Sequence, residues 1–200
     1  RAEFGDLVDS NANMGGGLGV QTQAINQLFQ QGSIVTTGNA LDLAITGNGF
    51  FTVQEPGATD FIYTRSGSFH ISAAGEIVNN LGQQLVGGSG TPPITLTGTG
   101  PWSNIIINTK TGVIEATDST GATAPASDVL GLVDFNNVQG LKKIGDTEWM
   151  ETTASGPPTP GGAGAPTPGL PGTGSLGNLM SGALEASNVD LTDQLVNMII

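Results

Sequence analysis

Cysteine is absent from this 200-residue sequence, and histidine and basic residues are scarce. Without cysteine, the chain forms no disulfide and offers no thiolate as a nucleophile or metal ligand. His70 is the single histidine, which excludes a metal site built from several histidines. We expect His70 to lie on the polar, exposed face of a short strand with a purely structural role.

Positive charge is also rare, since five basic residues face 17 acidic ones and the net charge is −12. Nucleic acid is not an expected partner, because phosphate contacts need clustered lysine and arginine. An anionic membrane surface is disfavoured for the same reason. No run of about 18 apolar residues occurs, so we expect no membrane insertion. The expected surface is acidic and solvated.

Glycine and proline are frequent, with 32 and 11 residues, whereas hydrophobic residues make up only 37%. This composition favours short strands joined by turns and argues against long buried helices. The length fits one large domain or two small ones. We therefore predict a mainly β fold of short antiparallel strands, with a modest core spread along a sheet.

The stretch 40–53 is the predicted centre of this fold. Leu41, Leu43 and Ile45 alternate with polar or small residues, which is typical of a strand with one buried face. A glycine-asparagine-glycine turn follows at 47–49, and an apolar run resumes at Phe50. The pattern predicts a β-hairpin whose buried residues include Leu43, Ile45 and Phe51.

Other short strands are predicted around this hairpin. They are Phe61–Thr64, Ser68–Ile71, Ile77–Val78, Leu81–Val86 and Val129–Phe135, and Ser33–Thr37 is an extended lead-in to the hairpin. Residues 1–86 and 129–182 then form one discontinuous β-rich domain, and 87–128 form a small inserted subdomain or extended hairpin. Proline and glycine dominate 156–174, where we predict an extended or mobile loop that forms neither helix nor ladder.

The two ends of the sequence carry different patterns. In 20–31, some apolar residues fall at helical spacing while others alternate as in a strand, so the pattern alone leaves both open. Near the other end, four apolar residues recur at helical spacing: Leu191, Leu195, Met198 and Ile199. We assign 183–200 to the start of a C-terminal helix that begins near Leu191, with Asp190 as its cap.

Three motifs suggest chemistry but lack the required context. Gly172–Gly177 matches a dinucleotide-binding fingerprint, but it follows a Pro/Gly segment instead of a strand. The stretch 9–20 begins like a calcium loop, yet it has Met14 and Val20 where glycine and glutamate belong. Glu148 and Glu151 could form a glycosidase pair, but no aromatic subsites surround them in the sequence. We predict no enzymatic activity, no catalytic residue, and no cofactor or metal site.

Four segments in order resemble the flagellar axial proteins, the hook and distal-rod family of bacteria. They are Thr37–Phe51, Tyr63–Phe69, Asp134–Asp146 and Gly182–Leu191. The resemblance implies a β-rich domain between two terminal helical segments that coil together and drive assembly into a tube. It also implies extended chain over 20–31 and export through the flagellar type III apparatus.

The function expected from this resemblance is structural. The segment from Ala183 to Leu191 is most similar to hook proteins, which implies a hook subunit that transmits torque from rod to filament. A distal rod subunit is the alternative, and a secreted carbohydrate-active β-protein is a more remote one. The room for an outer domain, 87–128, is short for a hook protein. Residues 1–31 are in turn too short to show the extra N-terminal sequence typical of distal rod proteins.

The resemblance also sets the expected partners and location. Copies of the chain itself are expected to form a homopolymer, bordered by rod, hook-cap and hook–filament junction proteins, in the extracellular flagellum. Both ends of the sequence look cut, because it opens without methionine and stops within an apolar stripe. We therefore expect this chain alone to be monomeric, with its C-terminal stripe pairing in the intact protein with a helix that precedes Arg1.

Overall fold

The computed structural model describes residues 2–6, 20–25, 29, 31–91, 93–145, 147–160 and 167–186. The chain divides into two compact units, residues 1–30 and residues 31–200. In the first unit, β1 (Ala2–Asp6) pairs antiparallel with β2 (Val20–Ile25). The extended chain that the resemblance implied is confirmed for 20–25. The stretch 9–19, which begins like a calcium loop, and the helix predicted near Leu191 lie outside the described residues.

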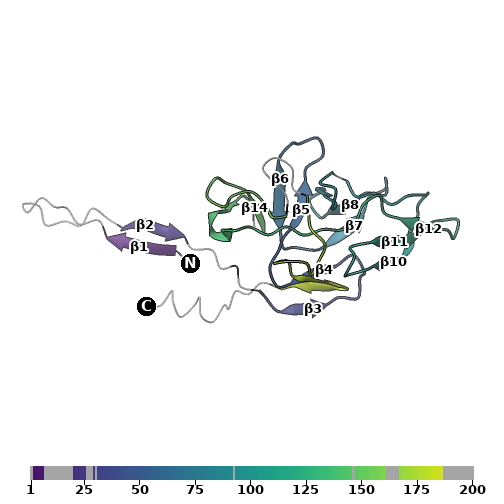
Figure 1. Ribbon diagram of the computed structural model, residues 1–200, viewed down its shortest axis with the longest axis horizontal. Coiled ribbons are helices and arrows are strands. Elements are labelled where there is room, and N and C mark those ends of the chain that lie inside the picture. The colour runs from purple at the N-terminus through teal and green to yellow at the C-terminus, as the bar shows by residue number, and fades with distance from the viewer. Residues whose placement is uncertain are drawn as a thin grey trace, which may run out of the picture. The chain divides into compact units, whose positions relative to one another are not determined.

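The second unit is built on a seven-stranded antiparallel sheet with the order β13-β14-β6-β5-β9-β8-β7 (Figure 1). Its strands are β5 (Phe51–Gln54), β6 (Phe61–Thr64), β7 (Phe69–Ile71), β8 (Ile77–Asn79), β9 (Gln84–Leu85), β13 (Lys142–Lys143) and β14 (Glu148–Met150). None exceeds four residues, as expected from a chain rich in glycine and proline.

Three smaller sheets complete the second unit. One has three strands, β10 (Ser103–Ile107), β11 (Ile114–Thr117) and β12 (Thr123–Pro125). The others are the pairs β4 (Leu43–Thr46) with β15 (Asn178–Ser181) and β3 (Ile34–Thr36) with β16 (Ala183–Glu185). Among the described residues, the only helical element is the short 3₁₀ turn η1 (Val138–Gly140). The predicted mainly β, antiparallel fold is confirmed.

The predicted hairpin over 40–53 is right in its burial and wrong in its pairing. Leu43, Ile45 and Phe51 are 1%, 0% and 0% exposed. However, β4 pairs with β15, while β5 pairs with β6 and β9. Gly47 and Gly49 have φ angles of 107° and 131°, and they carry the chain from one sheet into another. The stretch is a crossover between sheets, so both of its strands are covered on both faces.

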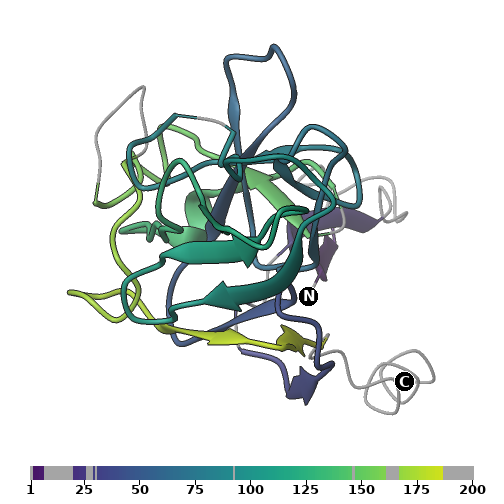
Figure 2. The ribbon, with the colours of Figure 1, turned by 90° about the vertical axis from the view of Figure 1, so that its right-hand side faces the viewer.

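The core runs continuously from this crossover into the three-stranded sheet. Ile94, Leu96, Ile107 and Ile114 belong to the same buried cluster as Leu43 and its neighbours. Figure 2 shows β10 and β11 in front of the larger sheet. Residues 93–127 therefore share their apolar contacts with the main sheet, and their separation as a subdomain stays a prediction.

Two predicted strands are shorter or more irregular than their patterns suggest. Only Gln84 and Leu85 of the predicted 81–86 strand are strand residues, and Leu81 is 72% exposed in the preceding turn. Asn79 fixes that turn by accepting hydrogen bonds from the amides of Leu81 and Gln83. The predicted strand 129–135 is instead a row of isolated bridges to four different partners. A local pattern marks such residues as extended but does not identify what they pair with.

Two boundaries in the second half of the chain are also corrected. The Pro/Gly-rich segment forms ladder contacts, because Thr159 bridges Asp134 and Gly169 bridges Leu132. Each bridge uses the amide of a residue that is not proline, so the neighbouring prolines do not prevent it. Residues 183–185, assigned to the start of a helix, form β16 instead. Their antiparallel partner β3 supplies backbone hydrogen bonds that outweigh the helical propensity of Ala183 and Leu184.

Candidate functional site

Arg65 lies in the bend that follows β6 and is the centre of the most connected polar cluster described here. Its side chain is 15% exposed, and the side chain of its partner Glu185 is 11% exposed. Gly67, two residues on, packs so tightly against the backbone of Leu43 that a Cβ atom would collide with it. This close packing holds the bend, and with it Arg65, against β4.

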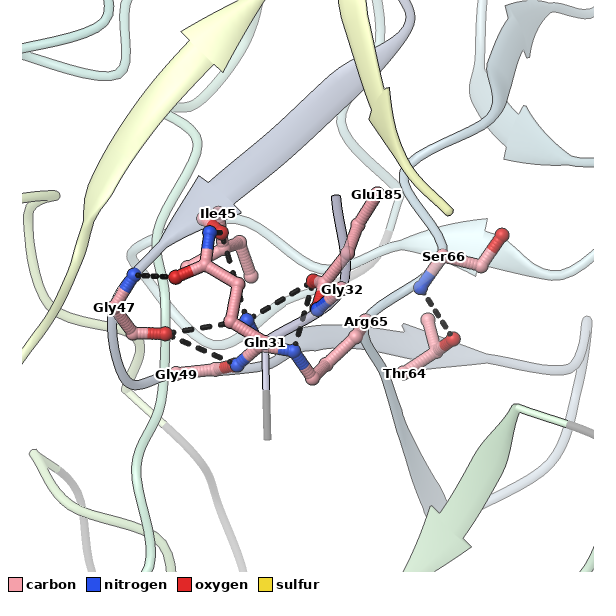
Figure 3. Close-up of polar contacts among 9 residues, drawn as sticks. All are labelled: Gln31, Gly32, Ile45, Gly47, Gly49, Thr64, Arg65, Ser66 and Glu185. Atoms are coloured by element: carbon pink, nitrogen blue, oxygen red, sulfur yellow. Dashed lines mark hydrogen bonds and ion pairs between the residues drawn. The ribbon is translucent and has the colours of Figure 1, made fainter. Parts of the chain in front are cut away.

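The guanidinium of Arg65 binds one carboxylate and a set of backbone carbonyls (Figure 3). Its Nε and Nη2 atoms each lie 3.0 Å from Glu185 Oε2. Its Nη1 donates to the carbonyl oxygens of Gly47, at 3.1 Å, and Gly49, at 3.0 Å. The fork geometry of arginine suits such divergent acceptors, which a single ammonium group would not reach together. Arg65 therefore fastens the crossover between β4 and β5 to the end of β16.

Gln31 and Gly32 attach the beginning of the second unit to the same point. Gln31 Nε2 donates to the carbonyl of Ile45 at 3.1 Å, and its Oε1 accepts from the amide of Gly47 at 3.1 Å. The amide of Gly32 donates to Glu185 Oε1 at 2.8 Å. We call the set Gln31, Gly32, Gly47, Gly49, Arg65 and Glu185 the Arg65 junction.

The junction fixes where the chain enters and leaves the second unit. In the β3–β16 pair, Ile34 lies opposite Glu185, and the amide of Ala186 donates to the carbonyl of Ser33 at 2.8 Å. Residues 31–34 and 183–186 are thus side by side and antiparallel. The arrangement holds two chain segments in a set direction; it contains no nucleophile or acid–base pair.

A second group missed by sequence reasoning is an aromatic cluster. Phe50, Tyr63, Phe135 and Trp149 stack edge to face, with centroid separations of 4.8 to 5.9 Å. Tyr63 and Trp149 looked scattered in the sequence, but β6 and β14 pair and bring them together. Burial, followed by the charge of Glu151 and a hydrogen bond to it, raises the pKa of Tyr63 far above its ordinary range. Phe50, Tyr63 and Phe135 are buried, and Trp149 is half-buried against them.

The candidate motifs for chemistry occupy unremarkable positions. His70 is exposed on β7, as predicted. Gly172–Gly177 forms a closed turn, in which the amide of Gly172 donates to the carbonyl of Gly177, and it leads into β15 instead of a helix. Glu151 is engaged with Tyr63. Across the described residues, no three metal-binding side chains gather, and no helix is long and apolar enough to cross a bilayer.

Comparison with known proteins places these features in one family. Residues 44–119 match the family described as "Flagellar hook protein FlgE/F/G D1 domain", and residues 180–200 match "Flagellar basal body rod FlgEFG protein C-terminal". The flagellar basal-body rod protein FlgG of Agrobacterium fabrum is 31% identical over 215 residues, which covers 100% of this chain and 76% of that protein. The chain belongs to the flagellar hook and rod axial protein family.

Two further relatives, one rod protein and one hook protein, show how similar this axial protein is to each branch of the family. FlgG of Buchnera aphidicola subsp. Schizaphis graminum is 36% identical over 184 residues, which covers 92% of the chain and 64% of that protein. The flagellar hook protein FlgE of Escherichia coli is 40% identical over 95 residues, covering 46% of the chain and 23% of that protein. Three of the segments that carried the family resemblance, 37–51, 63–69 and 182–191, contribute residues to the Arg65 junction. Four of the six junction residues, Gly47, Gly49, Arg65 and Glu185, therefore come from segments that carried the resemblance.

Proposed function

We propose that this axial protein is a distal rod subunit, which polymerises with copies of itself and passes torque along the flagellar axis without catalysing a reaction. The length of the match to rod proteins carries the proposal. Rod proteins align with 92% to 100% of the chain, whereas the hook protein aligns with 46%. The small three-stranded sheet at 103–125 also leaves little room for a large outer domain of the hook type.

The N-terminal unit adds support. β1 and β2 form an antiparallel ribbon within residues 1–30, a unit separate from the main β-unit. Additional sequence near the N-terminal helix is what the resemblance led us to expect of distal rod proteins. We take the ribbon as a candidate for this element, and so revise the expectation that residues 1–31 are too short to show it.

The Arg65 junction suggests how the subunit acts mechanically. Because residues 31–34 and 183–186 lie side by side, the segments on either side of the second unit start from neighbouring points. Segments that start together pair without a long connection, which favours coiling of the two terminal parts. The largely buried Arg65–Glu185 ion pair lies at that point, and its tight packing should transmit force between these segments and the β-unit with little local deformation.

A hook subunit is the second candidate. It is favoured by the 40% identity to a hook protein over 95 residues, which exceeds the identity to the rod proteins named above. Both candidates place the protein in the flagellum and both need neighbouring axial proteins as partners. They differ in position along the axis, and an experiment in the source bacterium separates them.

Deletion of the gene, followed by electron microscopy of purified basal bodies, tests the proposal. A distal rod subunit supports everything built beyond it, so its loss should leave a truncated rod with no hook. Reintroducing the gene should restore both parts. A complete rod that lacks only the hook would favour the hook subunit, and intact hooks on intact rods would overturn an axial role altogether.

A further inference from the structure

Two exposed surfaces of complementary character lie at opposite ends of the second unit. Figure 1 shows β14, the neighbour of β13, at one end and β10, β11 and β12 at the other. In Figure 2 the β10–β11 hairpin faces the viewer, and the edge that carries β13 lies away from it. We call Lys142, Lys143 and Ile144 the basic edge. The acidic groove is the hollow lined by Ile106, Asn108, Thr111, Val113 and Glu115.

The basic edge is the outermost strand of the seven-stranded sheet. Both lysines are exposed, and Ile144 is 40% exposed. Ile144 extends the pairing with β14 by donating its amide to the carbonyl of Glu148. Between described residues the only ion pair joins Arg65 and Glu185, so neither lysine is neutralised by a described carboxylate. Because side chains alternate along a strand, Lys142 and Ile144 share one face of this edge and Lys143 lies on the other, so the edge carries two of the chain's five basic residues.

The acidic groove lies on the hairpin formed by the outer strand β10 and the central strand β11 of the three-stranded sheet. Ile106, on β10, lies opposite Glu115, on β11, and is 56% exposed. Val113 adds a second apolar side chain to the lining, and Glu115 is exposed beside it. The groove therefore offers an apolar floor with a carboxylate at its rim. The groove combines an exposed isoleucine with an acidic residue, and the basic edge combines an exposed isoleucine with lysines, so the two surfaces are opposite in charge.

We propose that the basic edge of one copy docks into the acidic groove of the next copy. The inference rests on the proposed polymerising function and names the surfaces that carry one of its contacts. Copies with a net charge of −12 repel each other at long range, so a stable contact needs local complementarity. Ile144 covers Ile106 while a lysine pairs with Glu115. Because the two surfaces differ and lie at opposite ends, the contact is head to tail and propagates instead of closing a dimer.

These 200 residues contain no cysteine, so a crosslinking test requires only that any cysteine outside them in the full-length chain is first replaced by serine. Full-length chains carrying Ile144→Cys or Ile106→Cys are mixed, allowed to assemble, and oxidised with oxidised glutathione. The mixture should give a disulfide-linked dimer at least tenfold more abundant than either variant gives alone. Leu81→Cys, at another strongly exposed apolar position, replaces Ile144→Cys in the matched control and should crosslink no better than background.

The outcomes separate the contact from the function. Tubes that form normally without the specific crosslink would overturn the contact and leave the rod or hook function standing. Failure of the unmodified full-length chain to assemble would overturn both. Crosslinking of Ile144→Cys in cells to a different axial protein, in place of Ile106→Cys, would assign the basic edge to that neighbour and overturn self-docking.

A charge exchange tests the electrostatic part of the same contact. Glu115→Lys should raise the concentration needed for assembly at least tenfold, and so should Lys142→Glu with Lys143→Glu. The three changes together should restore assembly, because the charges are exchanged and not lost. Glu55→Lys changes an exposed carboxylate outside both surfaces and is the control for net charge. A combined variant no better than the single-site ones would contradict the pairing.

Discussion

Replacing Arg65 by methionine removes the charged centre of the junction while keeping an apolar side chain of similar length. Both partners of the Arg65–Glu185 pair are largely buried, at 15% and 11% exposure, so solvent screens the interaction only weakly. Removing one partner of a buried pair leaves the other charge uncompensated and costs about 3–5 kcal/mol. Gly47 is exposed, so water can rehydrate one of the carbonyls that Arg65 releases. We therefore expect a loss near the lower end, about 3 kcal/mol.

Glu185→Gln probes the same interaction from the other side. The amide oxygen still accepts from Gly32, and the guanidinium keeps its carbonyl partners, so the expected loss is about 1–2 kcal/mol. Urea unfolding of the two single variants and the double variant gives a mutant cycle, with an expected coupling of about 1 kcal/mol or more. Amide exchange should also accelerate at Gly32 and Gly47, whose N–H groups are held within the junction.

Glu55→Gln is the control, because Glu55 is exposed in the β5–β6 loop and should change stability by less than about 0.5 kcal/mol. An Arg65→Met variant that cost no more than this control would refute a stabilising role for the ion pair. Additive single variants would refute it too, since additivity would mean that Arg65 and Glu185 contribute independently.

Three further variants test the core. Leu43→Ala should lower the free energy of unfolding in urea by about 2–5 kcal/mol, because Leu43 is 1% exposed. Val35→Ala, at a 52% exposed position, is the control. A loss for Leu43→Ala as small as that of the control would show that Leu43 is not part of the core. Thr52 Oγ1 is buried with no hydrogen-bond partner among the described residues. Thr52→Val should therefore stabilise the protein in the same assay by about 1 kcal/mol. A destabilised variant would show that the hydroxyl has a hydrogen-bond partner. Tyr63 has a pKa raised above its ordinary value of 10.0, so its contribution to stability is fully present below pH 10 and falls above it. Tyr63→Phe should therefore lose less stability than the parent between pH 10 and 11 in thermal unfolding, and parallel losses would contradict the assignment.

Local sequence patterns identified several of the strands and the buried residues of the central stretch 40–53. The alternation of Leu41, Leu43 and Ile45 marked a strand, and all three are buried. The pairing of that strand with β15 could not be predicted from the sequence. β15 begins at Asn178, and no local pattern encodes a pairing over such a separation. The chain bends at Gly47 and Asn48, where a tight hairpin turn was expected, but the amide of Gly177 donates to the carbonyl of Asn48, which aligns β15 with β4.

The sequence patterns did not predict the Arg65 junction either. Its members come from sequence positions as distant as Gly32 and Glu185, which are separated by 153 residues. One signal was available: Arg65 is one of only five basic residues, and it stands in a bend beside polar and glycine residues. An arginine in such a setting often binds backbone carbonyls, because its planar fork offers five donors. The family resemblance, in contrast, could be recognised from the sequence. It depends on short runs of residues, and these can be identified without knowing what they contact in the fold.

Assembly into a tube is the central claim, and electron microscopy tests it most directly. The full-length gene product and this 200-residue chain are compared at matched concentration, with analytical ultracentrifugation recording the mass of each. We expect the full-length product to form tubes and this chain to sediment as a monomer, because the paired terminal segments supply the contacts that hold a tube together. Tubes formed by this chain alone would show that the β-unit drives assembly, and a full-length product that stays monomeric under all conditions would contradict the axial role.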